Sequence, residues 1–124
     1  MKVGIIVYPG SNCDKDTYNY FTHHGCECFY IWHHEDKLEK HIDLLVLPGG
    51  FAYGDRLYDK ATGDYTMEPG KMASTCPVKD IIKYAICNNI LILGICNGFQ
   101  ILIETGLLPV KLLENPDKKF TCKK

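Results

Sequence analysis

The chain has 124 residues, of which 46% are hydrophobic and 23% charged, and its formal net charge is -1. This length and composition predict one domain with a hydrophobic core, and the near-neutral charge argues against a nucleic-acid partner and a disordered tail. No apolar stretch reaches the roughly 20 residues of a membrane span, and the N-terminus reads as a strand and not as a signal peptide, so we expect no membrane partner and a cytoplasmic protein.

The sequence opens with a predicted strand and helix. An apolar run from Val3 to Tyr8 predicts a strand, which should stop at the breaker pair Pro9-Gly10. A helix is expected next, with Asn12 or Asp14 as its N-terminal cap. Gly25 should end this helix in left-handed geometry.

Two more strands and a long loop are predicted in the middle of the chain. Residues 26–32 and 43–47 are apolar enough to form strands, and residues 35–41 form an exposed connection between them. Residues 48–50, Pro-Gly-Gly, close the third strand. Residues 51–72 mix aromatic residues, glycines and charges without periodicity, which predicts a long loop that serves function, partner contact or disorder.

The last part of the sequence predicts one more helix and strand. Apolar residues recur at helical spacing over residues 77–88, with Pro at the start, and residues 90–93 form an apolar strand. Residues 120–124 look like the opening of another strand. Strands that alternate with helices predict a three-layer α/β fold with a mostly parallel sheet and helices on both faces, whose ligand site lies where the strands end.

Cys96 occupies the position where the fourth strand should turn abruptly into a helix. The segment from Gly94 to Gln100 reads GICNGFQ, so Gly94 and Gly98 flank the cysteine two residues away on either side. This is the cysteine form of the nucleophile elbow, in which a strained turn exposes a reactive side chain. A helix that begins there favours thiolate over thiol, so the pattern predicts acyl-transfer chemistry. The alternative is a buried core cysteine in a glycine-rich turn.

An acyl-transfer cysteine needs hydrogen-bond donors for the oxyanion that forms on the attacked carbonyl. The N–H of Asn97 is one candidate, and the loop at Gly49-Gly50 could provide the second, although this pair could also be a simple strand-ending turn. Gln100 lies one helical turn after Cys96, where its amide could bind a substrate amide or remain solvated.

The other cysteines and the histidines do not predict a metal site. The seven cysteines are odd in number and follow no secretory segment, so we expect reduced thiols. Cys26 and Cys28, between the histidine pairs at 23–24 and 33–34, match no common zinc spacing, so we expect no metal. All five histidines precede Cys96, and any of them could serve it as a base only if the fold brought them together.

Four segments resemble the class I glutamine amidotransferases and, among them, the glutaminase subunits of the phosphoribosylformylglycinamidine synthases of purine biosynthesis. They are VGIIVYPGSNCD from residue 3, LPGGFAYGDR from residue 47, ATGDYTMEPGKMA from residue 61 and LGICNGFQIL from residue 93. The DJ-1/PfpI proteins share a similar elbow, but GGFAYGD makes the match specific. The resemblance implies that residues 1–124 are the N-terminal part of a single glutamine amidotransferase domain with a flavodoxin-like sheet.

The resemblance also implies a reaction. Cys96 would attack the side-chain amide of glutamine, ammonia would leave, and water would release glutamate. In the family pattern Gly50 and Asn97 match the oxyanion hole, and Gln100 matches a glutamine-contacting position. Ammonia would pass to a separate synthetase subunit, with a small bridging subunit as a further candidate partner. ATP and magnesium would bind the synthetase, so we expect no cofactor in this chain.

One part of the family pattern has no match. The histidine base and glutamate of the family, an H-x-E motif, come far downstream of the elbow, and nothing after Cys96 in this sequence matches them. We therefore expect an N-terminal fragment or truncated product with an incomplete fold, an uncovered sheet edge and little activity alone. The alternatives are a non-catalytic, partner-binding fragment and a DJ-1/PfpI-like cysteine protein.

Overall fold

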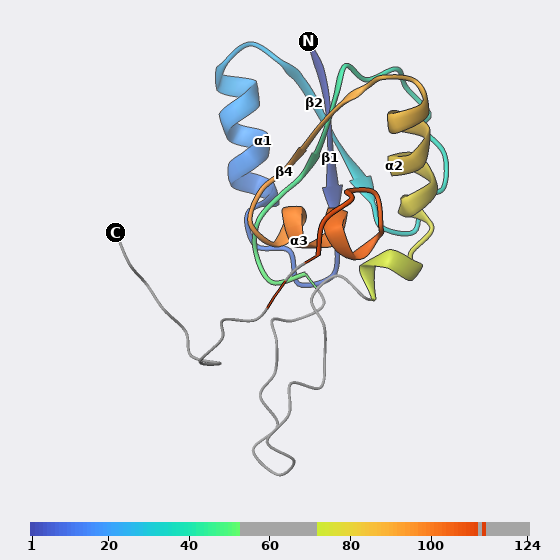
Figure 1. Cartoon of the computed structure of the whole chain (residues 1–124). Helices are drawn as coiled ribbons and strands as arrows, with labels where there is room; N and C mark the ends of the chain where they lie inside the picture. Colours follow the sequence, from blue (N-terminus) through green and yellow to red (C-terminus); the bar gives the residue numbers. More distant parts are fainter. Residues whose placement is uncertain (53–71, 112, 114–124) are drawn as a thin grey trace.

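The computed structural model describes residues 1–52, 72–111 and 113, which form a parallel α/β sheet structure. The four strands pair in the order β2-β1-β3-β4, and all pairings are parallel, as predicted (Figure 1). The elements are β1 (Lys2–Val7), α1 (Asp14–His23), β2 (Glu27–Trp32), β3 (Leu44–Leu47), the 3-10 helix η1 (Ala73–Thr75), α2 (Val78–Cys87), β4 (Leu91–Gly94) and α3 (Asn97–Glu104). No helix among these residues is both long and apolar enough to span a bilayer.

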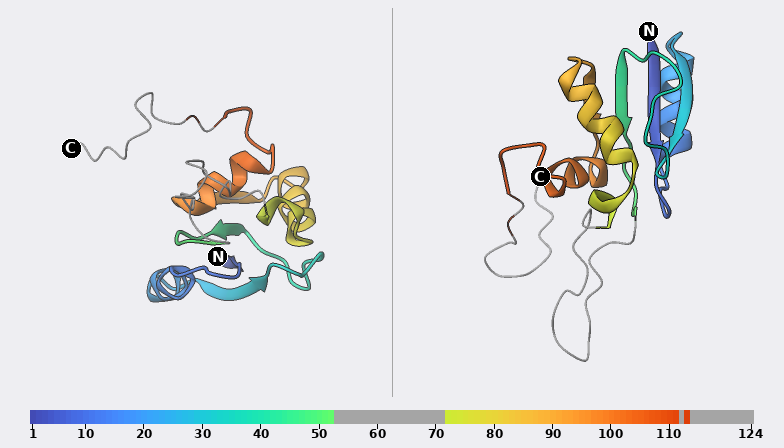
Figure 2. Two further views of the ribbon diagram at one scale, coloured as in Figure 1. Left: turned by 90° about the horizontal axis from the view of Figure 1, so that it is seen from below. Right: turned by 90° about the vertical axis from the view of Figure 1, so that its right-hand side faces the viewer.

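Helices cover both faces of the sheet. Figure 2 shows α1 on one side and α2 with α3 on the other. Alternate residues of β1 and β3 face the two sides, so that Val3 and Val46 pack with the α1 side chains while Ile6 and Leu45 pack with those of α2 and α3. Burial on both faces explains why β1 and β3 are apolar at almost every position.

The start of α1 differs from the prediction. Its N-cap residue is Cys13, which makes no side-chain cap, and Asp14 is already the first helical residue. The carbonyl oxygen of the Asn12 side chain instead accepts a hydrogen bond from the N–H of Phe51, at 3.0 Å. The predicted capping roles of Asn12 and Asp14 are therefore wrong, because a distant backbone N–H takes the oxygen that local rules assign to the helix. The predicted left-handed Gly25 is confirmed, with φ of +76°.

The remaining predicted elements in the described part of the chain are confirmed to within one or two residues. Strands expected at 26–32, 43–47 and 90–93 are β2, β3 and β4, and the helix expected from residue 77 is α2, with Pro77 as its N-cap. The short η1 was not predicted. The loop expected at 51–72 falls mostly on residues 53–71, and these, like the strand expected at 120–124, lie outside the described residues.

One face of β4 exposes apolar side chains. The register places Leu91 opposite Leu44 and Leu93 opposite Val46, so all four lie on the α1 side of the sheet. Helix α1 packs over β1 and β2 instead, at the other end of the sheet (Figure 2). As a result Leu91 is 66% exposed and Leu93 is 40% exposed. An exposed apolar strip on the last strand of a sheet favours association.

We expect the chain to self-associate through this strip, and we expect Leu91→Glu to reduce the association, because a charge on the strip must be desolvated when two copies pack together. Sedimentation velocity at rising protein concentration measures the effect. The matched control is Leu113→Glu, at a leucine that is 86% exposed and belongs to no strand. Equal sedimentation of the two variants would contradict a role for the β4 strip.

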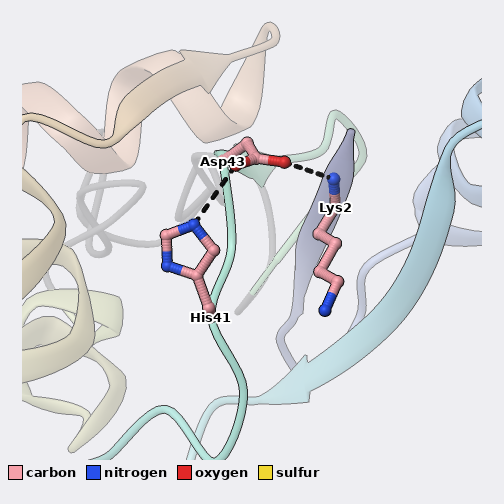
Figure 3. Close-up of polar contacts among 3 residues, drawn as sticks. All are labelled: Lys2, His41 and Asp43. Carbon is pink, nitrogen blue, oxygen red and sulfur yellow. Dashed lines mark hydrogen bonds and ion pairs between the residues drawn. The ribbon is translucent and has the colours of Figure 1, made fainter.

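A small polar cluster lies at the opposite edge of the sheet from Cys96, where β1 and β3 begin. The Asp43 carboxylate accepts a hydrogen bond from the backbone N–H of Lys2 at 2.7 Å and lies 3.2 Å from Nε2 of His41 (Figure 3). The Lys2 hydrogen bond contributes most to a lowered pKa of Asp43, partial desolvation opposes the shift, and His41 adds to it. The cluster thus favours the ionised carboxylate in the folded chain.

This shift predicts a modest pH dependence of stability. Because the pKa of Asp43 is lower in the folded than in the unfolded chain, its contribution is present above the unfolded pKa and is lost as the pH falls through the folded pKa. We therefore expect Asp43→Asn to lower the midpoint of urea unfolding near neutral pH and to lower it less near about pH 3. Asp80→Asn, at an exposed pair with Lys83 on α2, is the control. A loss that is equal at both pH values would contradict the assignment.

Candidate active site

Cys96 lies between β4 and α3 in a strained and exposed position. Its backbone has φ of 52° and ψ of -109°, which is uncommon for any residue other than glycine, and its side chain is exposed. It is the residue immediately before the first residue of α3. The turn predicted at Cys96 is therefore present, and the alternative of a buried core cysteine is wrong.

Two glycines allow the chain to fold back tightly around Cys96. A Cβ on Gly98 would overlap the carbonyl oxygen of Leu47 and would lie 2.6 Å from the carbonyl carbon of Leu47, at the end of β3. A Cβ on Gly94 would lie 2.7 Å from Cδ1 of Leu102 and 2.9 Å from Cα of Phe99. Neither glycine has a positive φ. The glycines are needed for space, because α3 packs directly against the strand ends.

The turn at Gly49-Gly50 lies beside Cys96. A Cβ built on Gly49 would be 3.5 Å from Cβ of Cys96 and 3.4 Å from the carbonyl oxygen of Ile95. Gly50 has φ of +129°, and a Cβ there would be 2.6 Å from the backbone nitrogen of Asn12. Both its conformation and its surroundings therefore require glycine at position 50. The predicted proximity of the turn to the cysteine is confirmed.

The loop after β1 reaches the same place. Ser11 forms an isolated antiparallel bridge with Gly50, and the N–H of Cys13 donates to the carbonyl oxygen of Gly49 at 3.3 Å. The segments that follow β1, β3 and β4 thus meet at the edge where the parallel strands end, at the lower edge of the sheet in Figure 1. This is the edge at which open α/β sheets bind ligands.

Asn97 and Gln100 line the first turn of α3 next to Cys96. The N–H of Asn97 belongs to the first helical residue and has no acceptor within the helix. The Asn97 side chain is buried, accepts a hydrogen bond from the N–H of Ala52 at 3.1 Å, and places its Nδ2 3.4 Å from Oε1 of Gln100. The sequence alone indicates the Asn97 N–H as a candidate oxyanion donor. It does not indicate the hydrogen bond of the Asn97 side chain, because the partner, Ala52, lies 45 residues away.

The fold keeps every histidine away from Cys96, and all five lie in the described residues. The pair 23–24 closes α1 and His41 precedes β3, so these three lie toward the edge where the strands begin. The pair 33–34 follows β2, and two strands separate β2 from β4. At about 4.8 Å per strand this separation is roughly 14 Å. No histidine of this sequence is placed to act as the base for Cys96.

Three other cysteines of the described residues have structural surroundings of their own. Cys26 and Cys28 pack against the cluster beneath α1, and Cys87 is exposed at the end of α2. The structure describes six of the cysteines, and none of these six is in a disulfide bond. No group of three or more His, Cys, Asp or Glu side chains in these parts of the chain is arranged to hold a metal ion.

Comparison with known proteins finds relatives along the whole sequence. The phosphoribosylformylglycinamidine synthase subunits PurQ of Pseudothermotoga lettingae, Thermotoga maritima and Methanothermobacter thermautotrophicus are 46%, 45% and 40% identical to this chain. The matches cover 98%, 96% and 98% of this chain and 48%, 50% and 51% of the relatives. The chain therefore spans about half the length of these curated relatives.

A solved structure and a family model agree with these matches. The structure of PurLQS from Thermotoga maritima superposes with a TM-score of 0.77 at 43% identity, covering 98% of this chain and 52% of that one. The predicted class I glutamine amidotransferase-like fold, present here in part, is thereby confirmed. The model of the CobB/CobQ-like glutamine amidotransferase domain matches residues 1–124. Since this match spans the entire sequence, the chain belongs to the CobB/CobQ-like glutamine amidotransferase domain family.

Proposed function

We propose that this chain supplies the nucleophile and the oxyanion-binding loop of the glutaminase subunit of a phosphoribosylformylglycinamidine synthase. One observation carries the proposal: Cys96 is exposed on a strained turn beside Gly49, where an added Cβ would lie 3.5 Å from Cβ of Cys96. Relatives that carry this subunit name are 40% to 46% identical across nearly the whole chain. The geometry supports a cysteine nucleophile, and the names of the relatives support its use in a phosphoribosylformylglycinamidine synthase.

The reaction that fits this geometry is the transfer of a glutamyl group to sulfur. The Cys96 thiolate attacks the side-chain carbonyl carbon of glutamine, and the carbonyl electron pair moves onto oxygen. The N–H groups of Gly50 and Asn97 stabilise this oxyanion, and Gln100 contacts the bound glutamine. When the carbonyl re-forms, the carbon–nitrogen bond breaks, and the nitrogen takes a proton from solvent water and leaves as ammonia. Water then hydrolyses the thioester to glutamate and restores the thiol.

The proposal assigns the use of ammonia to another protein. The PurQ relatives are named as synthase subunits, and the structural neighbour is named PurLQS. We assign ATP and magnesium to a synthetase subunit, we assign no cofactor to this chain, and we count a small bridging subunit as a second partner. A cytoplasmic location stays a prediction of the same kind.

The chloroketone analogue of glutamine tests the proposed nucleophile, because it carries a ketone where glutamine has its amide and alkylates the attacking sulfur. We expect Cys96 to react much faster than Cys87, which is also exposed but lies at the other end of the fold. L-Glutamine should slow the reaction and D-glutamine should not. Peptide mass mapping over time measures both rates. Equal rates at the two thiols, or no protection by L-glutamine, would favour a non-catalytic role.

A further inference from the structure

Two asparagine side chains hold the segment that follows the Gly49-Gly50 turn. The N–H of Phe51 donates to Oδ1 of Asn12 at 3.0 Å, and the N–H of Ala52 donates to Oδ1 of Asn97 at 3.1 Å. Asn12 follows β1 and Asn97 begins α3, so the two acceptors come from positions 39 and 45 residues away in the sequence. The backbone N–H groups of two consecutive residues, Phe51 and Ala52, thus donate hydrogen bonds to side chains from two different segments of the fold.

The turn needs such external contacts. Gly50 adopts φ of +129°, and glycine loses more conformational freedom than any other residue when its backbone is fixed. Two glycines in sequence have no side chains with which to pack their own turn. A catalytic hydrogen-bond donor must nevertheless be held within about 0.5 Å of its productive position. The contacts that fix Gly50 therefore have to come from its neighbours.

Building on the proposed function, we propose that the side chains of Asn12 and Asn97 are positioning residues for the Gly50 N–H. Each acts through the backbone just beyond Gly50, and they hold this N–H where the oxyanion forms. Asn97 contributes more, because its side chain is only 4% exposed, whereas Asn12 is exposed and water competes for its hydrogen bond. Asn97 thus has two roles, since its backbone N–H faces the oxyanion and its side chain fixes the second donor.

The test compares two reagents at the same sulfur in the full chain. The chloroketone analogue of glutamine forms an oxyanion on its ketone, while iodoacetamide reacts by simple displacement and reports the accessibility and ionisation of the thiol. The ratio of the two rate constants at Cys96 therefore isolates oxyanion stabilisation. The variants are Asn97→Leu and Asn12→Leu, which remove the acceptor, and Asn12→Asp, which keeps it. The control is Asn88→Leu. The side chain of Asn88, the C-cap residue of α2, donates a hydrogen bond to the backbone carbonyl oxygen of Tyr84.

We expect Asn97→Leu to lower the ratio about tenfold or more and Asn12→Leu to lower it about threefold. Both reductions are smaller than the roughly hundred- to thousandfold loss of rate that follows when an oxyanion donor itself is removed. Asn12→Asp should stay within about twofold of the wild type, because a carboxylate oxygen still accepts the N–H. The control should leave the ratio unchanged. If Asn97→Leu does not fold, the exposed Asn12→Leu and Asn12→Asp still decide the question.

Three results would each overturn the inference. A high wild-type ratio that both leucine variants retain would overturn the positioning role and leave the proposed function intact. A wild-type ratio at Cys96 no higher than the ratio at Cys87 would overturn the proposed function and the positioning role together. A loss shared equally by Asn12→Leu and Asn12→Asp would also overturn it, because the acceptor oxygen would then not be what matters.

Discussion

Replacing Gly98 with alanine is expected to destabilise the chain by about 3 kcal/mol, a large part of the stability of a small domain. The added methyl group would overlap the backbone carbonyl oxygen of Leu47, and no side-chain rotation relieves an overlap with backbone. Helix α3 would have to move away from the end of β3. Since this helix carries Asn97 and adjoins Cys96, the same change should also abolish the preference of Cys96 for the chloroketone.

Urea unfolding followed by circular dichroism measures this loss, with Gly25→Ala as the matched control. Gly25 follows α1, a Cβ there meets no atom within 4 Å, and only its φ of +76° is unfavourable for alanine. That backbone cost is about 1 to 2 kcal/mol. A Gly98→Ala variant as stable as Gly25→Ala would show that α3 does not pack as closely on β3 as the structure has it.

The second large effect concerns catalysis. We expect the 124-residue chain to release ammonia from glutamine about a hundred- to ten-thousandfold more slowly than a full-length PurQ relative does, because general-base assistance typically contributes that much. The reason is structural, since the fold places all five histidines away from Cys96. A coupled assay for ammonia measures the rate, and Cys96→Ala sets the background.

Added imidazole sharpens this prediction. If the rate of ammonia release is low because no histidine near Cys96 transfers protons, imidazole in solution should raise this rate for the wild-type chain. It should leave the rate of Cys96→Ala at background. A rate for the unassisted chain that matches a full-length relative would contradict the account, since none of the five histidines lies close enough to the sulfur to act as its base.

The sequence predicts most of the fold because its signals are local. Apolar runs bounded by Pro and Gly locate the strands, and the spacing of Gly94 and Gly98 around Cys96 locates the strained turn. The glycines at 49 and 50 predict a close backbone approach, and the structure has it. Each of these predictions depends on a few neighbouring residues and on the steric limits of the backbone.

The features that the sequence does not predict depend on distant contacts. Asn12 has the composition and position of a helix cap, yet its oxygen bonds to Phe51 on another segment. The side chain of Asn97 likewise finds its partner at Ala52. Leu91 and Leu93 form an apolar run typical of a buried strand, but one face of β4 is exposed because α1 packs elsewhere. No local pattern distinguishes these outcomes from their alternatives.

The measurement that tests the central claim most directly is the mass of the Cys96 peptide after the chain is incubated with L-glutamine and quenched in acid. Because thioester hydrolysis also needs proton transfer, the acylated form should accumulate. We predict one added γ-glutamyl group on Cys96, none on Cys13 or Cys87, and none in Cys96→Ala. An unmodified Cys96 after prolonged incubation, or equal modification of the other thiols, would contradict the claim that this turn presents an amide-attacking nucleophile.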